Sequence, residues 1–281
     1  MQGYDYSWLT HVNTKRLRQH MFSSKKLAAA GIVAAAALAL TACSDETAPV
    51  ENADGPLLVT AGTLTVCSNA PFEPFEYNDA DGNLTGIDID LTKLAAEKLG
   101  LEYVAMQYDF DAMSSGAAFE SNSCDVLATG MTITPERQAK FDFSDPYYDA
   151  NQGALVKTGS TATSLKDLEG KNVGAQVETT GLTIAKDAGF DVQVFPEVGS
   201  LVQAVATGQI DAAIADIGVL ESYTTDELSI AFTEKTDEQY GFGVKKDNPK
   251  LVEALNAAIK DAKADGTYDE IITKHVGAAG N

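Results

Sequence analysis

Arg137 and the hydroxyl residues before it form the clearest chemical grouping in the sequence. They lie in residues 125–148, which read DVLATGMTITPERQAKFDFSDPYY. Thr132 and Thr134 precede Arg137 where a strand is expected to turn into a helix. A guanidinium can hold both oxygens of a carboxylate, and free N–H groups at a helix start suit a small anion. The grouping indicates a carboxylate-binding site, although a surface arginine beside an ordinary βα turn fits equally well.

A second grouping lies later in the chain. Thr179 and Thr180 stand where a helix is expected to begin, and Asp216 ends the apolar run of residues 211–216. Ligands of α/β folds bind outside the carboxyl ends of the strands, where these side chains would lie. Each residue taken alone also fits simple capping of a helix, so both interpretations stay open.

Local sequence signals explain how the first grouping would be positioned. Residues 125–129 form a short apolar run that is typical of a buried strand, and Gly130 breaks it. Thr134 followed by Pro135 predicts a helix N-cap with proline in the first helical position. Arg137 is therefore expected just beyond the end of a strand.

Strand and helix patterns alternate from residue 62 onward. The expected strands are residues 63–68, 84–89, 101–107, 125–129, 154–157, 171–176, 191–195, 211–216 and 240–245. The expected helices are residues 90–99, a segment within 111–120, 165–168, 179–188, 201–206, 248–266 and 267–275. This alternation predicts an α/β fold with mostly parallel sheets.

The charge of the chain restricts its partners. Its 281 residues include 20 Lys and Arg against 41 Asp and Glu, for a formal net charge of -21. Phosphate backbones repel such a chain, so nucleic-acid binding is not expected. The spacing of its Cys and His residues matches no metal motif, so neither a metal nor a cofactor is expected, and His275 is expected to be an inert surface residue.

The N-terminal region has the pattern of an export signal. Residues 1–42 hold the basic pair Lys25 and Lys26, then an apolar run, residues 27–40, that is short for a membrane span. The sequence LTAC that ends at Cys43 resembles the bacterial lipobox, which implies lipidation of Cys43; a plain secretory signal is the alternative. Residues 1–20 precede a second good start, Met21, which we expect to be the true start.

The segment after the signal is acidic and rich in small residues. We expect residues 43–56, which begin with the lipidated cysteine, to form a flexible tether.

Seven segments of the sequence occur in the order that is found in one protein family. They are APFEPFEY, GNLTGIDIDL, GMTITPERQAKFDFSDPYY, ETTG, GQIDAAIAD, QYGFGVKK and KADGTYDEI. Together they resemble the extracellular solute-binding proteins of the polar-amino-acid class that serve ABC importers (bacterial solute-binding protein family 3). The resemblance implies a type II periplasmic-binding-protein fold with two α/β lobes joined by two crossover strands. Lobe 1 would comprise residues 57–149 and 240–281, and lobe 2 residues 150–239.

The resemblance also implies a set of ligand-binding residues. They are Asn69, Phe72, Phe110, Thr129, Gly130, Met131, Thr132, Arg137, Gln176, Thr179, Thr180 and Asp216. Thr132 and Arg137 would hold an α-carboxylate, and Asp216 an α-ammonium. Phe72 and Phe110 would flank the ligand side chain, while Gly130 and Met131 would supply backbone contacts.

Some residues depart from the usual pattern of that family. Asn69 stands where binders of basic amino acids often have an acid, and Gln176 is neutral where side-chain specificity is often set. Glu178 replaces the usual glycine before the threonine pair, and Glu73 lies in the aromatic loop; either could favour a cationic ligand. Neutral polar, cationic and cystine-like amino acids all remain open.

Cys67 and Cys124 are the two cysteines left once Cys43 is lipidated. In an exported protein an isolated pair is usually a disulfide. We expect this bond, although strand register could keep the two residues apart.

These observations favour a lipid-anchored, monomeric receptor on the outer face of the cell membrane, carrying a polar amino acid to an ABC permease. It would be no enzyme. The alternative is an exported lyase of the cyclohexadienyl or arogenate dehydratase kind on the same fold, with Glu178 or Glu73 as its acid. The sensing half of a signalling protein is a third possibility, which the lack of a later apolar span disfavours.

Overall fold

The structure is a computed structural model that describes residues 55–276. The signal segment, Cys43 and all but the last two residues of the expected tether lie outside the described residues. The described residues all belong to one compact unit. No helix within residues 55–276 is both long and apolar enough to cross a membrane.

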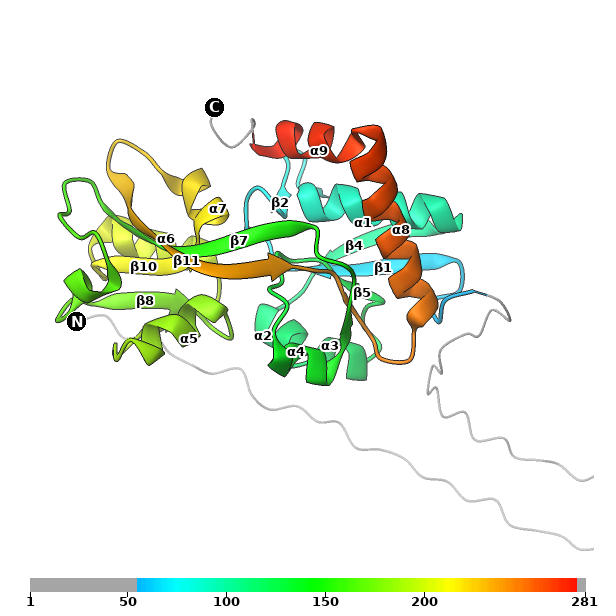
Figure 1. The fold of residues 1–281 in the computed structure, drawn as a ribbon, viewed down its shortest axis with the longest axis horizontal. Helices are drawn as coiled ribbons and strands as arrows, with labels where there is room; N and C mark the ends of the chain where they lie inside the picture. The colour runs from blue at the N-terminus through cyan, green and yellow to red at the C-terminus, as the bar shows by residue number, and fades with distance from the viewer. Residues whose placement is uncertain (1–54, 277–281) are drawn as a thin grey trace, which may run out of the picture. The chain divides into compact units, whose positions relative to one another are not determined.

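Two five-stranded sheets organise the chain (Figure 1). The first has the order β4 (Glu102–Gln107), β1 (Thr63–Ser68), β5 (Val126–Leu127), β12 (Gly243–Val244) and β6 (Asp142–Phe143). The second has the order β11 (Leu228–Tyr240), β7 (Tyr148–Lys157), β10 (Ala212–Asp216), β8 (Val173–Gln176) and β9 (Gln193–Phe195). A small hairpin pairs β2 (Tyr77–Asn78) with β3 (Leu84–Thr85). We call each five-stranded sheet with its helices the first and the second lobe.

Helices cover both faces of the first sheet. One face carries α1 (Ile87–Leu99), α8 (Pro249–Asp265) and α9 (Thr267–Val276), and the other carries α2 (Phe110–Ser114), α3 (Ala117–Glu120) and α4 (Pro135–Lys140), as Figure 1 shows. Leu91 and Leu255 pack into the core cluster that contains Leu64 of β1. Phe119 and Phe141 belong to a separate buried cluster on the other face. Apolar side chains on both faces of a sheet are typical of parallel α/β architecture.

The second lobe is built in the same way. Its helices are α5 (Thr180–Asp187), α6 (Val198–Thr207) and α7 (Ile217–Leu220), with 3-10 turns at η1 (Leu165–Leu168) and η2 (Glu221–Tyr223). Helices α5 and α6 both contact β8 and β10, and Figure 1 shows them on opposite sides of the sheet. The expected α/β architecture with two lobes is therefore confirmed. The expectation of mostly parallel sheets was wrong, because β7 pairs antiparallel with β10 and β11, and β12 pairs antiparallel with β5 and β6.

Two long strands link the lobes. β7 and β11 pair antiparallel, with register shifts after Ile230 and after Glu234. At its end β11 reaches the first lobe, where Tyr240 forms an isolated bridge with Thr132 and its carbonyl accepts a 3.0 Å hydrogen bond from the Tyr147 N–H. The residue boundaries given above for the lobes stay a prediction.

Parallel pairing sets where the pocket forms. β1 pairs parallel with β5, and β10 pairs parallel with β8. The carboxyl ends of parallel neighbours lie at the same edge of a sheet. Asn69 and Thr129 therefore follow β1 and β5 at one edge of the first sheet, while Gln176 and Asp216 end β8 and β10 at one edge of the second.

Candidate functional site

A small pocket, with a cavity volume of about 10 Å³, brings together residues from both lobes. Its lining residues are Asn69, Phe72, Phe110, Thr129, Gly130, Thr132, Arg137, Gln176, Thr179, Thr180 and Asp216. Met131 is the one expected ligand-binding residue outside this lining, because its fully buried side chain packs in the cluster with Phe119 and Phe141. The backbone contact expected at Met131, like the roles of the lining residues, stays a prediction.

Arg137 is held by the turn that the sequence predicted. The Thr134 hydroxyl accepts from the Arg137 N–H at 3.2 Å, and Pro135 is the first helical residue of α4. The Arg137 guanidinium donates to the carbonyl of Thr132 at 2.8 Å and to that of Glu178, in the second lobe, at 2.9 Å. Its Cζ atom lies 5.4 Å from the centre of the Phe110 ring. Burial lowers the pKa of Arg137, yet a guanidinium stays charged in proteins, so the pocket holds a fixed cation.

Asp216 supplies the opposite charge from the second lobe. It is buried at the end of β10, and its Oδ1 accepts from Gln152 Nε2 at 3.1 Å. Burial, together with the nearby carboxylate of Glu238, raises the pKa of Asp216 to about 7. A cationic ligand group beside Asp216 would lower this pKa, because a nearby positive charge favours the ionised form of a carboxyl group.

Gly130 fits only as glycine. Its φ of 50° is in the left-handed region, and a Cβ atom there would lie 2.4 Å from the Phe72 ring. Glycine tolerates this φ without the steric cost that other residues meet. The close approach lets Phe72 pack directly on the backbone at the carboxyl end of β5, so an aromatic face borders the pocket.

Two buried acids lie behind the pocket. The Thr129 hydroxyl donates to Glu76 Oε1, and the Gly130 N–H donates to Asp88 Oδ2 at 2.8 Å. The Tyr147 hydroxyl donates to the other oxygen of Asp88 at 2.6 Å. Burial raises the pKa of Glu76 and of Asp88. The two acids thus fix the turn at Thr129 and Gly130, which borders the pocket.

Sequence reasoning missed Gln152, Glu76 and Asp88 as parts of the site. Asp88 stands between Ile87 and Ile89 and Glu76 follows Phe75, so each acid is flanked by buried apolar residues. An acid in such a setting is usually paired when buried, and this signal could have identified both. Gln152 gave no comparable signal, because its partners come from three distant segments of the chain.

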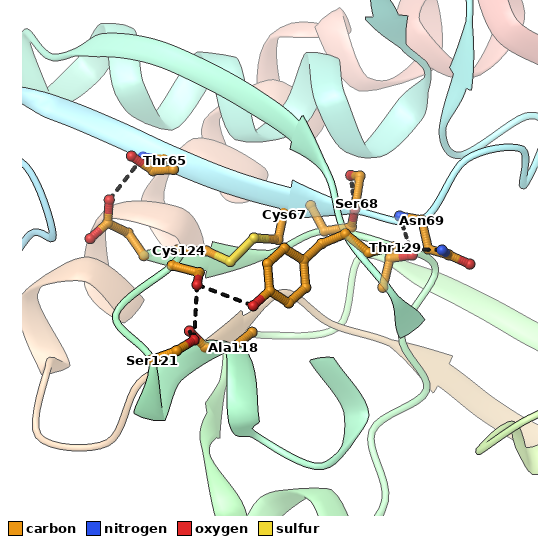
Figure 2. The surroundings of a disulfide bond; sticks show 12 residues. Thr65, Cys67, Ser68, Asn69, Ala118, Ser121, Cys124 and Thr129 are labelled. Atoms are coloured by element: carbon orange, nitrogen blue, oxygen red, sulfur yellow. Dashed lines mark hydrogen bonds between the residues drawn. A yellow bond between two sulfur atoms is a disulfide. The ribbon is translucent and has the colours of Figure 1, made fainter. Parts of the chain in front are cut away.

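Cys67 and Cys124 form a disulfide in the structure, with their Cα atoms 5.8 Å apart. Figure 2 shows the bond between β1 and the loop that enters β5. Asn69 and Thr129 follow these two strands, and the Asn69 N–H donates to the Thr129 hydroxyl at 3.2 Å. The bond therefore joins two segments that each deliver residues to the pocket.

The expectation of a surface position for His275 was wrong. Its side chain is 1% exposed, and its Nε2 lies 2.7 Å from Asp90 Oδ2 and its Nδ1 2.9 Å from the Tyr77 hydroxyl. These contacts attach the end of α9 to α1 and to β2, so His275 has a packing role in the first lobe. Among residues 55–276, no cluster of three or more His, Cys, Asp or Glu side chains could hold a metal.

The comparison with protein families agrees with this arrangement. Residues 64–278 match the family of bacterial extracellular solute-binding proteins, family 3. The chain belongs to this family. A curated relative, the arginine-binding extracellular protein ArtP of Bacillus subtilis (strain 168), is 33% identical over 252 residues, which cover 86% of this chain and 94% of the relative.

Solved structures share the fold of this family member. An ancestral arginine-binding protein bound to glutamine is 39% identical, with a TM-score of 0.72 over 77% of this chain and 98% of the other. The ancestral amino-acid-binding protein AncCDT-1, a precursor of cyclohexadienyl dehydratase, is 34% identical, with a TM-score of 0.70 over 76% and 95% of the two chains. The expected family and type II periplasmic-binding-protein fold are thus confirmed.

Proposed function

We propose that this protein binds a free polar amino acid between its two lobes and delivers it to the permease of an ABC importer. One observation carries the proposal: a buried cation, Arg137 of the first lobe, and a buried acid, Asp216 of the second, line one pocket. An amino acid is a zwitterion, and both of its charges need partners when water is expelled. In this proposal Arg137 and Thr132 hold the α-carboxylate and Asp216 holds the α-ammonium.

The other lining residues take the roles that the family resemblance gave them. Phe72 and Phe110 flank the ligand side chain, and Thr179 and Thr180 approach from the second lobe. The protein is exported, anchored at the outer face of the membrane through a lipid on Cys43, and acts as a monomer. The names of its relatives, which are amino-acid-binding proteins, support the ligand class.

The protein acts as a receptor and not as an enzyme in this proposal. Because the chain is similar to a precursor of cyclohexadienyl dehydratase, a lyase of that kind is the enzyme alternative to test. Neither Glu178 nor Glu73 is among the lining residues, and the Glu178 side chain is exposed in an outer groove. Incubation with prephenate and arogenate should therefore give no turnover.

A thermal-shift screen tests the proposal. The mature protein is heated with each proteinogenic amino acid and with ornithine, citrulline and cystine. A ligand that binds only the folded state at about 100 times its Kd stabilises it by about 2.7 kcal/mol, a shift of several degrees. The α-amide of the best ligand is the matched control, since it lacks the carboxylate and should give little shift. A screen in which no amino acid raises the melting temperature refutes the proposal.

A further inference from the structure

One buried amide nitrogen joins two acids beside the pocket. Gln152 Nε2 lies 3.1 Å from Asp216 Oδ1 and 2.8 Å from Glu238 Oε2. Thr180 Oγ1 is a third acceptor, at 3.2 Å. An ionised carboxylate can only accept, whereas a hydroxyl can also donate, and an amide nitrogen carries two hydrogens. The hydrogens of Gln152 Nε2 are therefore best used on Asp216 and Glu238, and the shared donor makes these two acids neighbours.

A bulge in β11 delivers Glu238 to this position. The register of β11 on β7 shifts between Glu234 and Glu238, so residues 235–237 form the bulge. Asp237 has a φ of 52°, in the left-handed region. Bulges redirect side chains and are common beside functional sites. The Glu238 side chain thereby reaches Gln152, although the strand partner of Gln152 is Glu234.

Glu238 lies outside the ligand pocket. Its half-buried side chain lines the outer groove between α4 and α5, which Arg137 also borders, and it is not among the lining residues of the pocket. Glu238 is therefore not placed to contact a ligand in the pocket. Its effect on binding passes through Gln152 and through its charge.

The groups around Asp216 set the balance of its two protonation states. The charged and titratable groups that face it are Glu76, Arg137, Tyr148, Glu238 and Tyr240. Arg137 favours the ionised carboxyl, whereas burial and Glu238 oppose it and prevail, so the pKa of Asp216 is raised to about 7. Of the acids Glu76 and Glu238, only Glu238 shares a hydrogen-bond donor with Asp216.

We infer that Glu238 is a positioning residue of the binding site, which acts on Asp216 through Gln152 and makes capture of the ligand ammonium sensitive to mild acid. This inference rests on the proposed function and adds a regulation to the same site. An ammonium group beside Asp216 favours loss of the proton that the two neighbouring acids retain. Capture therefore releases a proton, and mild acid promotes release of the amino acid.

Carbon-13 NMR of the free mature protein tests the link between the two acids without a ligand. The carboxyl signal of Asp216, assigned by its absence from Asp216→Asn, is followed from about pH 4 to about pH 9. Glu238→Gln keeps an oxygen acceptor for Gln152 but removes the charge, so the midpoint of the Asp216 titration should fall by about half a pH unit or more. Glu234→Gln removes an exposed charge from the same strand and is the matched control, which should leave the midpoint unchanged.

Isothermal titration calorimetry tests the effect on binding. L-Arginine and L-glutamine are the probes, and the Kd at about pH 6 is divided by the Kd at about pH 8, because this ratio cancels any change in affinity that is independent of pH. The ratio should be about 10 in the wild type and in Glu234→Gln, and about 3 or less in Glu238→Gln. Glu238→Asp keeps the charge on a shorter side chain, so its ratio should exceed that of Glu238→Gln.

The outcomes separate this inference from the proposed function. An Asp216 midpoint that is the same in the wild type and in Glu238→Gln overturns the inference, and so does an equal Kd ratio in these two proteins. A wild type that binds no amino acid, while Glu238→Gln still moves the midpoint, refutes the proposed function and leaves the link between the acids standing. If Glu238→Gln does not fold, Glu238→Ala takes its place and should lower the midpoint in the same way.

Discussion

The Arg137 guanidinium donates a 2.9 Å hydrogen bond to the main-chain carbonyl of Glu178 in the other lobe. Glu178 has a φ of 57°, in the left-handed region that favours glycine. Backbone strain of this kind costs about 1–3 kcal/mol and concentrates at functional sites. The strain thus lies at the residue whose carbonyl joins the lobes beside the pocket.

Relief of this strain is the first prediction. Glu178→Gly should raise the free energy of unfolding by about 1 kcal/mol, because glycine adopts this φ without a Cβ clash. Urea denaturation measures the change. Gly100→Ala is the reciprocal control, because Gly100 has a φ of 66° and no neighbour that a Cβ would touch. This variant should lower the free energy of unfolding through backbone strain alone. A Glu178→Gly variant less stable than the wild type would contradict the assignment of strain.

Gln152 is expected to orient Asp216. Its Nε2 lies 3.1 Å from Asp216 Oδ1, 3.2 Å from Thr180 Oγ1 and 2.8 Å from Glu238 Oε2, whereas its buried Oε1 has no partner among the described residues. Gln152→Met keeps the shape and removes the donor. Ligand affinity should fall about 10-fold while stability changes by less than about 1 kcal/mol, since an unpartnered oxygen is removed as well. Calorimetry that gives wild-type affinity for Gln152→Met would rule out the positioning role.

The affinity for an amino acid should decrease as pH falls. In the free protein the pKa of Asp216 is raised to about 7, so below this pH its carboxyl is protonated and cannot pair with an ammonium. The Kd should therefore rise by up to about 10-fold for each pH unit below about 7. Near this pH, binding should release a fraction of a proton. Calorimetry in buffers of different ionisation enthalpy detects the release; an affinity that is constant between about pH 5 and pH 8 would argue against Asp216 as the ammonium partner.

The same acid should make the free protein less stable at neutral pH. Between the ordinary pKa of 3.8 and the folded pKa of about 7, the folded state keeps a proton that the unfolded chain has lost. Stability therefore falls as pH rises through this window. Asp216→Asn should melt several degrees above the wild type at about pH 8, with the difference shrinking toward about pH 4, and should bind no ligand. Asp187→Asn, on the exposed end of α5, is the control and should change neither property.

The disulfide should contribute to stability rather than to binding. Its cysteines are separated by 57 residues, so the bond removes much freedom from the unfolded chain. Replacement of both by alanine should cost about 2–4 kcal/mol of unfolding free energy. Because neither cysteine lines the pocket, the ligand Kd should change less than about threefold at temperatures where the variant is folded. A loss of binding without a loss of stability would reverse this assignment.

Local signals predicted the starts of α4, α5 and α8, whereas α1 begins at Ile87, inside the expected strand of residues 84–89, and α6 begins at Val198 rather than at residue 201. Thr134 and Pro135 begin α4, and Gly100 ends α1 with a φ of 66°, because capping depends on residues a few positions apart. The helix expected within residues 111–120 is two short helices, since Gly116 has a φ of 87° between them. The 13-residue strand β11 was missed, because its polar residues 233–239 become a strand only by pairing with β7.

At the candidate site, too, sequence patterns could not connect residues that lie far apart in the chain. Arg137 alone left a binding site and a surface residue equally supported, and only the family resemblance connected it with Asp216. Glu238 and Gln152 could not be joined from sequence, since β7 and β11 bring them together across 86 residues. Local sequence patterns therefore cannot predict contacts that depend on the register of distant strands.

Calorimetry on Arg137→Ala tests the central claim most directly. The best amino acid from the thermal-shift screen is titrated into the wild type, into Arg137→Ala and into Lys140→Ala. Lys140→Ala is the control, because it removes the same charge from the same helix, whereas the Lys140 side chain pairs with Glu136 outside the pocket. Arg137→Ala should lose about 3–5 kcal/mol of binding free energy, since the ligand carboxylate would be buried unpaired, while Lys140→Ala should keep wild-type affinity. Binding by Arg137→Ala at wild-type affinity would contradict the proposed pocket.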